Sequence, residues 1–195
     1  IEACVREAGD AEKISASLMN ATDLVRESDY YAAQGGRHVI GSEDVQQAID
    51  ARIHRASRIR DRLQEEILRG TLLIDTDGSV TGQVNGLAVY QGVDYGFGLP
   101  VRITARVSAG REGIINVERE AELSGPLHTK GIMVIAGFLR GSFARDYPLC
   151  LSASICFEQS YSSVDGDSAS STEIYALLSS LSADVRVAAA CAEGR

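Results

Sequence analysis

The sequence predicts an α+β protein, in which a small all-helical region precedes a region of mixed helices and strands. Residues 1–70 of the 195-residue chain contain no proline, and their apolar residues recur at steps of three and four. After Gly70, short segments alternate apolar and polar residues, as half-buried strands do. We therefore expect two domains, residues 1–70 and residues 71–195, and the second contains the segment of greatest functional interest.

The first region is expected to hold two long helices. One follows the cap residues Asn20–Asp23 and ends at Gly35–Gly36. The other begins at Ser42, with acids in its first turn, and keeps helical spacing as far as Ile67. Arginines between its apolar positions are expected to form a solvated face that pairs with nearby acids, and a nucleotide contact is the alternative. They are Arg52, Arg55, Arg58, Arg60 and Arg62.

The second region is expected to contain several strands and two helices. The strands are Leu72–Ile74, Val80–Tyr90, Pro100–Val107, Ile114–Val117, Leu149–Phe157 and a final one at Val185–Cys191. The helices are Leu127–Leu139 and Glu173–Leu181. Ser170 and Glu173 have the spacing of a capping box at the start of the second helix.

Composition argues against several classes of function. The net charge of -8 argues against nucleic-acid binding, and the sequence lacks an apolar run long enough to span a membrane. The cysteines are too few for a disulfide scaffold and lack zinc-ligand spacing, so reduced thiols in a cytoplasmic protein are expected. They are Cys4, Cys150, Cys156 and Cys191. The start at Ile1 has no signal pattern and indicates a fragment of a longer chain.

The most informative segment runs from Phe157 to Ser170. A strand-like stretch ends, an Asp/Gly turn follows at residues 165–167, and Ser168 stands at the mouth of a helix. This arrangement presents a hydroxyl beside backbone N–H groups, which suits a nucleophile. A helix-cap hydroxyl is the alternative, and the local pattern alone favours it.

The segment resembles the nucleophile motif of the Lon-type ATP-dependent serine proteases, and its Asp-Gly-Asp-Ser-Ala-Ser version is closer to the B-type, Lon-related branch. Further blocks that resemble this family lie at Gly82–Val89, Phe97–Ala105, Asn116–Glu120 and Leu123–Gly131. The likeness extends over roughly residues 70–186. It implies a Lon-type proteolytic domain, incomplete at its C-terminus, after a helical subdomain that resembles the lid of an AAA+ ATPase.

The resemblance implies a Ser-Lys dyad with Ser168 as the nucleophile. Gly166 would let the chain bend, Asp167 would support the turn, and Asp165 would orient the lysine or hold an inactive arrangement. A lysine base requires a pKa lowered by burial. No metal site is implied.

The sequence departs from the family where the base is expected. Residues 169–195 contain neither Lys nor His, and the likeness fails near Arg186, as a truncation or an altered reading frame would explain. His128 and Lys130 are the other candidates by type, and we expect them to serve as a cap and a surface charge. The isolated chain is therefore expected to have little or no peptidase activity.

The resemblance also implies properties of the parent enzyme. Lon-type proteases work as hexameric rings that thread and degrade unfolded or regulatory proteins with ATP and Mg²⁺. Arg26 lies where the family often carries a sensor-2 arginine, although a surface pair with Asp23 or Asp29 is nearly as well supported. The chain lacks a phosphate-binding loop, so we expect it to bind no nucleotide alone. The alternatives are an inactive assembly module and an ATP-independent Ser-Lys peptidase, which the lid-like helices disfavour.

Overall fold

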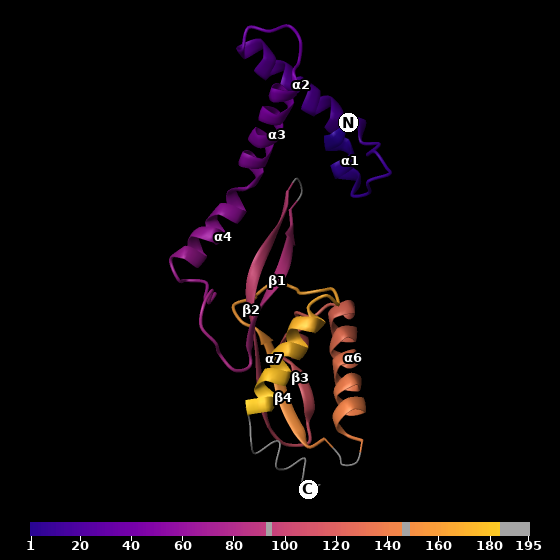
Figure 1. Ribbon diagram of the computed structural model, residues 1–195, viewed down its shortest axis with the longest axis vertical. Coiled ribbons are helices and arrows are strands. Elements are labelled where there is room, and N and C mark those ends of the chain that lie inside the picture. Colours follow the sequence, from indigo (N-terminus) through magenta and orange to yellow (C-terminus); the bar gives the residue numbers. More distant parts are fainter. Residues whose placement is uncertain (93–94, 146–148, 184–195) are drawn as a thin grey trace. The chain divides into compact units, whose positions relative to one another are not determined.

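The computed structural model describes residues 1–92, 95–145 and 149–183, which form seven helices and a four-stranded sheet (Figure 1). The mixed α and β content agrees with the predicted fold class. The chain separates into two compact units, the first built on residues 1–62 and the second beginning at Leu63. The predicted domain division at residue 70 stays a prediction. Each unit is described by itself.

The first unit is helical. It contains α1 (Glu2–Ala8), α2 (Leu18–Gln34), α3 (Ser42–Ala56) and the beginning of α4 (Arg58–Leu68). Helices α2 and α3 pack against each other, and Ala32 and Ala48 are the apolar residues buried there. Small side chains let two helices approach closely but bury little apolar surface.

Two details of these helices differ from the prediction. Helix α2 begins at Leu18, so Asn20–Asp23 lie within it, and the Thr22 hydroxyl donates to the Leu18 carbonyl at 2.7 Å. The second predicted helix is divided into α3 and α4, because the helix is interrupted at Ser57. That residue is buried, and its hydroxyl donates to Asp61 at 2.9 Å. A polar side chain that bonds locally competes with helix continuation.

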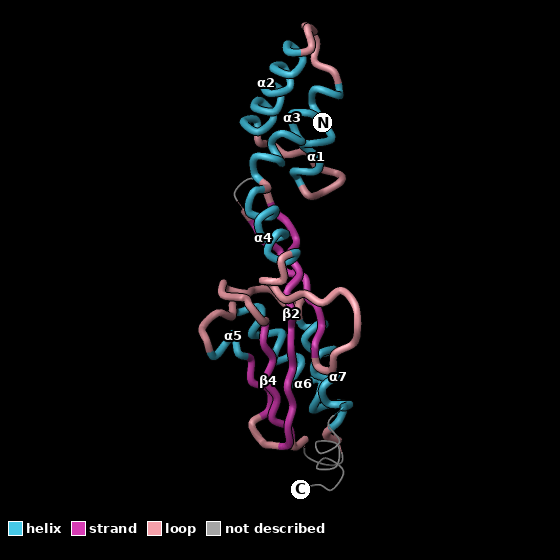
Figure 2. Tube along the Cα trace, turned by 90° about the vertical axis from the view of Figure 1, so that its left-hand side faces the viewer, coloured by secondary structure: helices cyan, strands magenta, loops and turns pink. Residues whose placement is uncertain are grey.

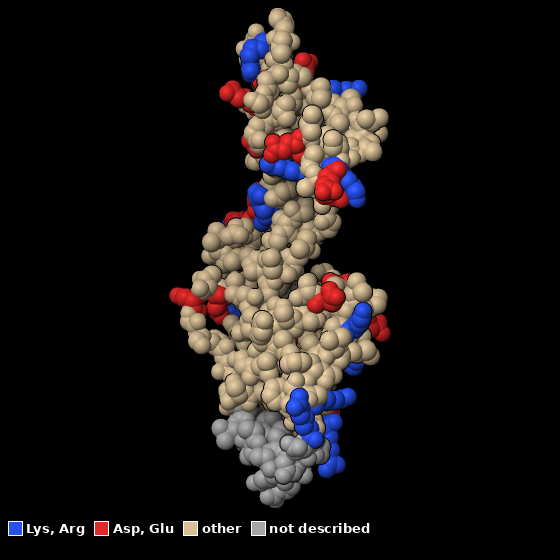
Figure 3. All heavy atoms as spheres, turned by 45° about the vertical axis from the view of Figure 1, so that its right-hand side comes forward, with Lys and Arg blue, Asp and Glu red and all other residues tan. Residues whose placement is uncertain are grey.

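Exposed ion pairs lie on the surface of the first unit, and two of the arginines expected to form a solvated face, Arg55 and Arg60, take part in them. Arg55 contacts Glu27 across α2 and α3 at 2.6 Å, and Lys13 contacts Asp10 at 3.0 Å. Figure 3 shows acidic and basic side chains beside one another on this unit. Exposed pairs of this kind add little stability, because water screens them.

The second unit is organised around a mixed sheet. Its strands are β1 (Gln83–Gln91), β2 (Gly96–Ala109), β3 (Gly113–Asn116) and β4 (Leu151–Phe157), in the order β1-β2-β4-β3. Strand β2 is antiparallel to β1 and β4, whereas β3 is parallel to β4. Along β4, buried residues alternate with half-buried ones, which is the period-2 pattern seen in the sequence.

Two helices cover one face of this sheet. Helices α6 (Pro126–Phe143) and α7 (Ser170–Ala183) lie on the same side of the strands, and the short α5 (Val117–Glu120) follows β3 (Figure 2). Their inner faces and the facing strand residues form the core. It consists of Ile103, Ala105, Ile132, Ile135, Leu139, Leu151, Ala153, Ile155, Phe157, Ala176 and Leu177.

Two local predictions for the second region are wrong. Leu72–Ile74 is not a strand, because its backbone bonds to a side chain: Leu73 N–H donates to Gln159 Oε1 at 2.8 Å. The capping box of Ser170 and Glu173 is not formed, since Glu173 is buried and bonds to His128 instead. The predicted strand at Val185–Cys191 and Arg186, where the likeness fails, lie outside the described residues.

Among the helices that the structure describes, none is sufficiently long and apolar to span a membrane.

Candidate functional site

Ser168 lies in the turn that immediately precedes α7. The residue is exposed, and within the described part of the chain its hydroxyl has no hydrogen-bond partner. The hydroxyl therefore makes no capping contact, and the Ser168 carbonyl instead accepts from the Ser171 hydroxyl at 3.4 Å. An exposed hydroxyl at a helix start is accessible to a polypeptide substrate and stands near backbone N–H groups.

The chain before Ser168 is fixed to the start of α6. Gly125 N–H donates to the Val164 carbonyl at 2.8 Å, and Val164 N–H donates to the Leu123 carbonyl at 2.8 Å. These bonds form a parallel bridge between Ser124 and Val164. The turn that carries the serine is thus anchored by backbone contacts to a helix far away in the sequence.

Asp165 completes this anchor. Its Oδ1 accepts from Leu127 N–H at 3.0 Å and from His128 N–H at 3.2 Å, which satisfies two of the free donors at the beginning of α6. The Gly166 and His128 N–H groups lower the pKa of Asp165, Gly166 most strongly. The carboxylate thus caps α6 from a separate segment of the chain.

Two glycines are required by this geometry. Gly166 has a φ of 105°, a backbone conformation that residues with a side chain rarely adopt. A Cβ added to Gly125 would lie 2.3 Å from Asp165 Cγ, so a larger residue would displace the capping carboxylate. Asp167 is exposed, and its carbonyl accepts from Ser170 N–H at 3.2 Å. This bond turns the chain into α7.

The side chain of His128 is not the cap that we expected. Its side chain is fully buried, with Nε2 2.8 Å from Glu173 Oε1 and Nδ1 2.9 Å from Ser124 Oγ. A sequence signal for this burial exists. His128 lies four residues before Ile132 and continues the buried stripe of α6, which also includes Ile135 and Leu139. Lys130 is exposed, in agreement with the expected surface charge.

The Glu173 hydrogen bond is the main cause that raises the pKa of His128, while burial opposes the increase. Glu118 and Asp165 raise it further by their charges. Both ring nitrogens are engaged, so the imidazole has no free position from which to accept the proton of another hydroxyl. His128 in this arrangement is therefore a structural group and not a base for Ser168.

Arg26 is exposed, and its Nη1 lies 3.4 Å from Asp23 Oδ1. Asp23 also lines a hollow of about 430 Å³ in the first unit. The other lining residues are Asn20, Leu24, Glu27, Arg52, Arg55 and Ala56. Two acids and two arginines balance the charge of this hollow, and Arg55 is already paired with Glu27. A role for Arg26 in nucleotide binding stays a prediction.

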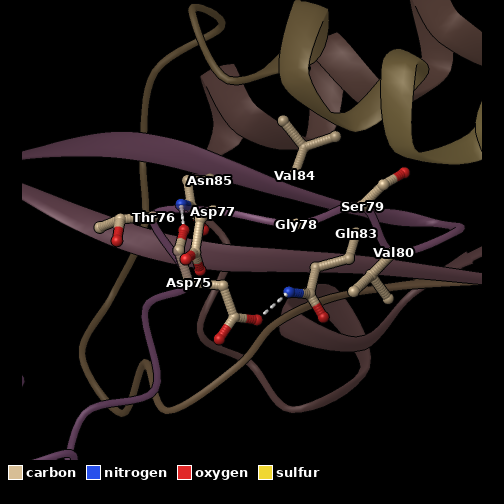
Figure 4. Close-up of a pocket in the computed structure, with 9 residues that line it drawn as sticks. All are labelled: Asp75, Thr76, Asp77, Gly78, Ser79, Val80, Gln83, Val84 and Asn85. Carbon is tan, nitrogen blue, oxygen red and sulfur yellow. Dashed lines mark hydrogen bonds between the residues drawn. The ribbon is translucent and has the colours of Figure 1, made fainter.

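A second hollow of about 200 Å³ lies at the beginning of β1 (Figure 4). Its central carboxylate, Asp75, accepts from Gln83 Nε2 at 2.7 Å and from Arg102 Nη2 at 2.9 Å. Asn85 Nδ2 donates to the Asp75 carbonyl at 2.7 Å. Within the described chain, no group of three or more His, Cys, Asp or Glu residues is placed to hold a metal ion. We interpret the hollow as a hydrogen-bonded turn beside the sheet.

Comparison with known proteins supplies the family. Residues 1–55 match the family described as "Archaeal LonB, AAA+ ATPase LID domain". A protein of Escherichia coli (strain K12), named "Putative Lon protease homolog", is 39% identical over 166 residues, covering 84% of this chain and 28% of that protein. This chain is a Lon-related protein. A Haemophilus influenzae protein of the same printed name is 32% identical over 179 residues, covering 91% of this chain and 29% of that protein.

The Lon-related chain spans less than a third of the length of these curated relatives. The aligned length in each case exceeds either unit alone, so the similarity includes parts of both units. The match to the lid family agrees with the expectation for the N-terminal helices.

Proposed function

We propose that this chain contributes the nucleophile region of a Lon-like serine endopeptidase, with Ser168 as the nucleophile. The observation that carries the proposal is the exposed, unbonded hydroxyl of Ser168 in a turn that Asp165 and Val164 fix to α6. The relationship to proteins named as Lon protease homologues supports the same assignment. Free N–H groups at the start of α7 would stabilise the oxyanion that forms when the hydroxyl attacks a peptide carbonyl.

Such an attack requires a base that takes the proton of Ser168. A lysine would serve in the Ser-Lys dyad, yet the lysines of the sequence are Lys13 and Lys130, and both are exposed. His128 is buried with both nitrogens occupied. We therefore propose that the 195-residue chain alone cleaves peptides slowly or not at all.

The remaining properties belong to the parent enzyme. The lid-family match to residues 1–55 supports an AAA+ motor that uses ATP. We further propose that Mg²⁺ accompanies the ATP and that Arg26 senses its phosphates. We propose unfolded or regulatory proteins as substrates, a ring-shaped homo-oligomer such as a hexamer as the working form, and the cytoplasm as its location.

Labelling with a fluorophosphonate tests the assignment of Ser168 without requiring turnover, because alkaline pH can deprotonate an accessible serine in place of the missing base and the reagent then traps it covalently. We expect mass spectrometry to locate the label at Ser168 at alkaline pH, with loss of labelling in Ser168→Ala. Ser162 is an exposed serine of the same connection, so Ser162→Ala is the matched control and should label normally. Equal labelling of Ser162 and Ser168 would show that Ser168 has no special reactivity.

The second candidate is an inactive assembly module. It is favoured by the absence of Lys and His from residues 169–195 and by the occupied ring of His128. Incubation with casein tests the inactivity that both candidates predict for the 195-residue chain alone. We expect no difference between the chain and Ser168→Ala, whereas serine-dependent cleavage would contradict the inactive module.

A further inference from the structure

We propose that His128 is the positioning residue of the Ser168 turn, holding the chain on both sides of the nucleophile. Its backbone and its ring contact different segments. The backbone N–H donates to Asp165, three residues before Ser168, and the ring Nε2 bonds to Glu173, five residues after it. The inference rests on the proposed function only for its catalytic consequence.

Of these two contacts, the bond between the His128 ring and Glu173 is the stronger. His128 and Glu173 are both fully buried, and their atoms lie 2.8 Å apart. Burial makes a charge-assisted hydrogen bond between them costly to break. Glu173 Oε2 is buried without a hydrogen-bond partner among the described residues, so the bond from His128 to Oε1 is the principal compensation for burying this carboxylate. The first turns of α7 are therefore tied to α6 through this pair.

The other side of the ring continues the network. Ser124 Oγ lies 2.9 Å from His128 Nδ1 and 3.0 Å from Thr129 Oγ1, and the Thr129 hydroxyl donates to the Gly125 carbonyl at 3.0 Å. Gly125 N–H in turn donates to Val164. The ring is thus linked by hydrogen bonds, through Ser124, Thr129 and Gly125, to the same backbone bridge that fixes the chain before Ser168.

The network accommodates either charge state of the imidazole. In the imidazolium, Nδ1–H donates to Ser124, the Ser124 hydroxyl donates to Thr129, and Thr129 donates to the Gly125 carbonyl. In the neutral ring, with its proton on Nε2, the direction at Nδ1 reverses and the Ser124 hydroxyl donates to the nitrogen. Loss of the proton therefore reorders the hydroxyls beside the Val164 bridge without removing the bond to Glu173.

Three acidic groups surround the ring and bias it toward the imidazolium: Glu173 on α7, Glu118 on α5 and Asp165 in the serine turn. Glu118 is itself buried, and its Oε1 accepts from Phe157 N–H at 2.7 Å. The Phe157 ring lies edge-on to the imidazole, with centroids 5.3 Å apart. Deprotonation of His128 keeps the bond to Glu173 but removes its charge assistance, and this weakening loosens the Ser168 turn.

Hydrogen exchange in the 195-residue chain tests the positioning role. In His128→Phe, which keeps an aromatic ring but loses both nitrogens, we expect amides 165–170 to exchange roughly ten- to hundredfold faster. Glu173→Gln keeps the shape and an acceptor, so it should fold and give a smaller increase in the same amides. Leu139→Ala, buried in α6, is the control and should accelerate exchange across the second unit without selecting this turn.

A pH titration by NMR supplies a readout that a purely structural residue would not move. The amide signals of Gly166 and Ser168 should follow the His128 midpoint, and both should shift together in Glu173→Gln. Turn signals that ignore His128, a His128 that fails to titrate from about pH 5 to about pH 9, or unselective exchange in His128→Phe would overturn the inference. None of these measurements needs cleavage, so a failure of fluorophosphonate labelling would remove the proposed function alone.

Discussion

The two units of this chain are stabilised in different ways. The second unit contains a continuous apolar core that joins the sheet to α6 and α7, whereas Ala32 and Ala48 are the buried apolar residues of the first. Both units also expose large apolar side chains, so the contrast between them lies in the core. Those of the first unit include Ile14, Leu18, Met19, Val25, Tyr30, Val39, Ile53 and Ile59. Burial of apolar surface is the main favourable term in folding, so the second unit should be considerably more stable by itself.

The comparison also locates the costly polar interactions. Three ionisable residues of the second unit are buried, namely Glu118, His128 and Glu173, and His128 and Glu173 bond to each other. In the first unit Asp44 is buried, but its partner Arg37 is half exposed. Substitutions in the two units should therefore differ in magnitude, and they provide ways to test the contrast.

The largest loss of stability is expected for Glu173→Ala. Removing one member of a buried pair leaves His128 without its partner, which typically costs about 3–5 kcal/mol. Urea unfolding followed by circular dichroism should show the loss in the transition of the second unit. Glu173→Gln keeps the hydrogen bond and serves as the control. An equal loss in both variants would show that charge, rather than the bond itself, stabilises this site.

Leu177→Ala should have the next largest effect. The side chain is fully buried against the sheet, and deleting a buried leucine side chain costs about 2–5 kcal/mol, because it loses contacts and leaves a cavity. Val25→Ala is the matched change in the first unit, where the side chain is 57% exposed. Similar losses in both variants would contradict the difference between the units.

Much of this architecture could be predicted from sequence patterns. Alternation identified β4, and helical spacing identified α6. The pattern failed where a side chain supplied a distant contact. Gln159 bonds to Leu73, and Glu173 bonds to His128, over 86 and 45 residues respectively. Local propensity contains no information on such partners, so the predicted strand and capping box were wrong.

The candidate site shows the same limit. The position of Ser168 before a helix followed from local turn residues. Its fixation by Asp165, however, depends on a contact with His128 on α6, which lies 37 residues away in the sequence. The burial of His128 could have been predicted from its place on the apolar stripe of α6. A titratable residue in such a stripe is expected to have a buried partner.

The stability of the second unit should also depend on pH through His128. Its folded pKa is raised above the ordinary value of 6.5, so its contribution is fully present below that value and is lost as the pH rises through the folded pKa. Unfolding in urea at a series of pH values should show this decrease. The decrease should be weaker in Glu173→Gln, and an unchanged dependence in that variant would exclude this pair as its cause.

Asp165→Asn should produce a smaller change on the acidic side. The folded pKa of Asp165 is lowered, so its stabilising effect is present above its unfolded pKa and is lost as the pH falls through the folded pKa. Stability measured from neutral to acidic pH should fall less steeply in the variant. Asp167→Asn alters an exposed neighbour without contacts to α6 among the described hydrogen bonds and is the control.

The smallest effect is expected for Arg26→Ala in the first unit. The arginine is 76% exposed and forms a long contact with Asp23, so its loss should change stability by less than about 0.5 kcal/mol. Any larger consequence of this substitution would then come from a bound partner and not from folding. A parent enzyme that loses ATP turnover, while the chain keeps its unfolding midpoint, would assign Arg26 to the nucleotide. A parent enzyme with normal turnover would leave Arg26 as a surface residue of α2.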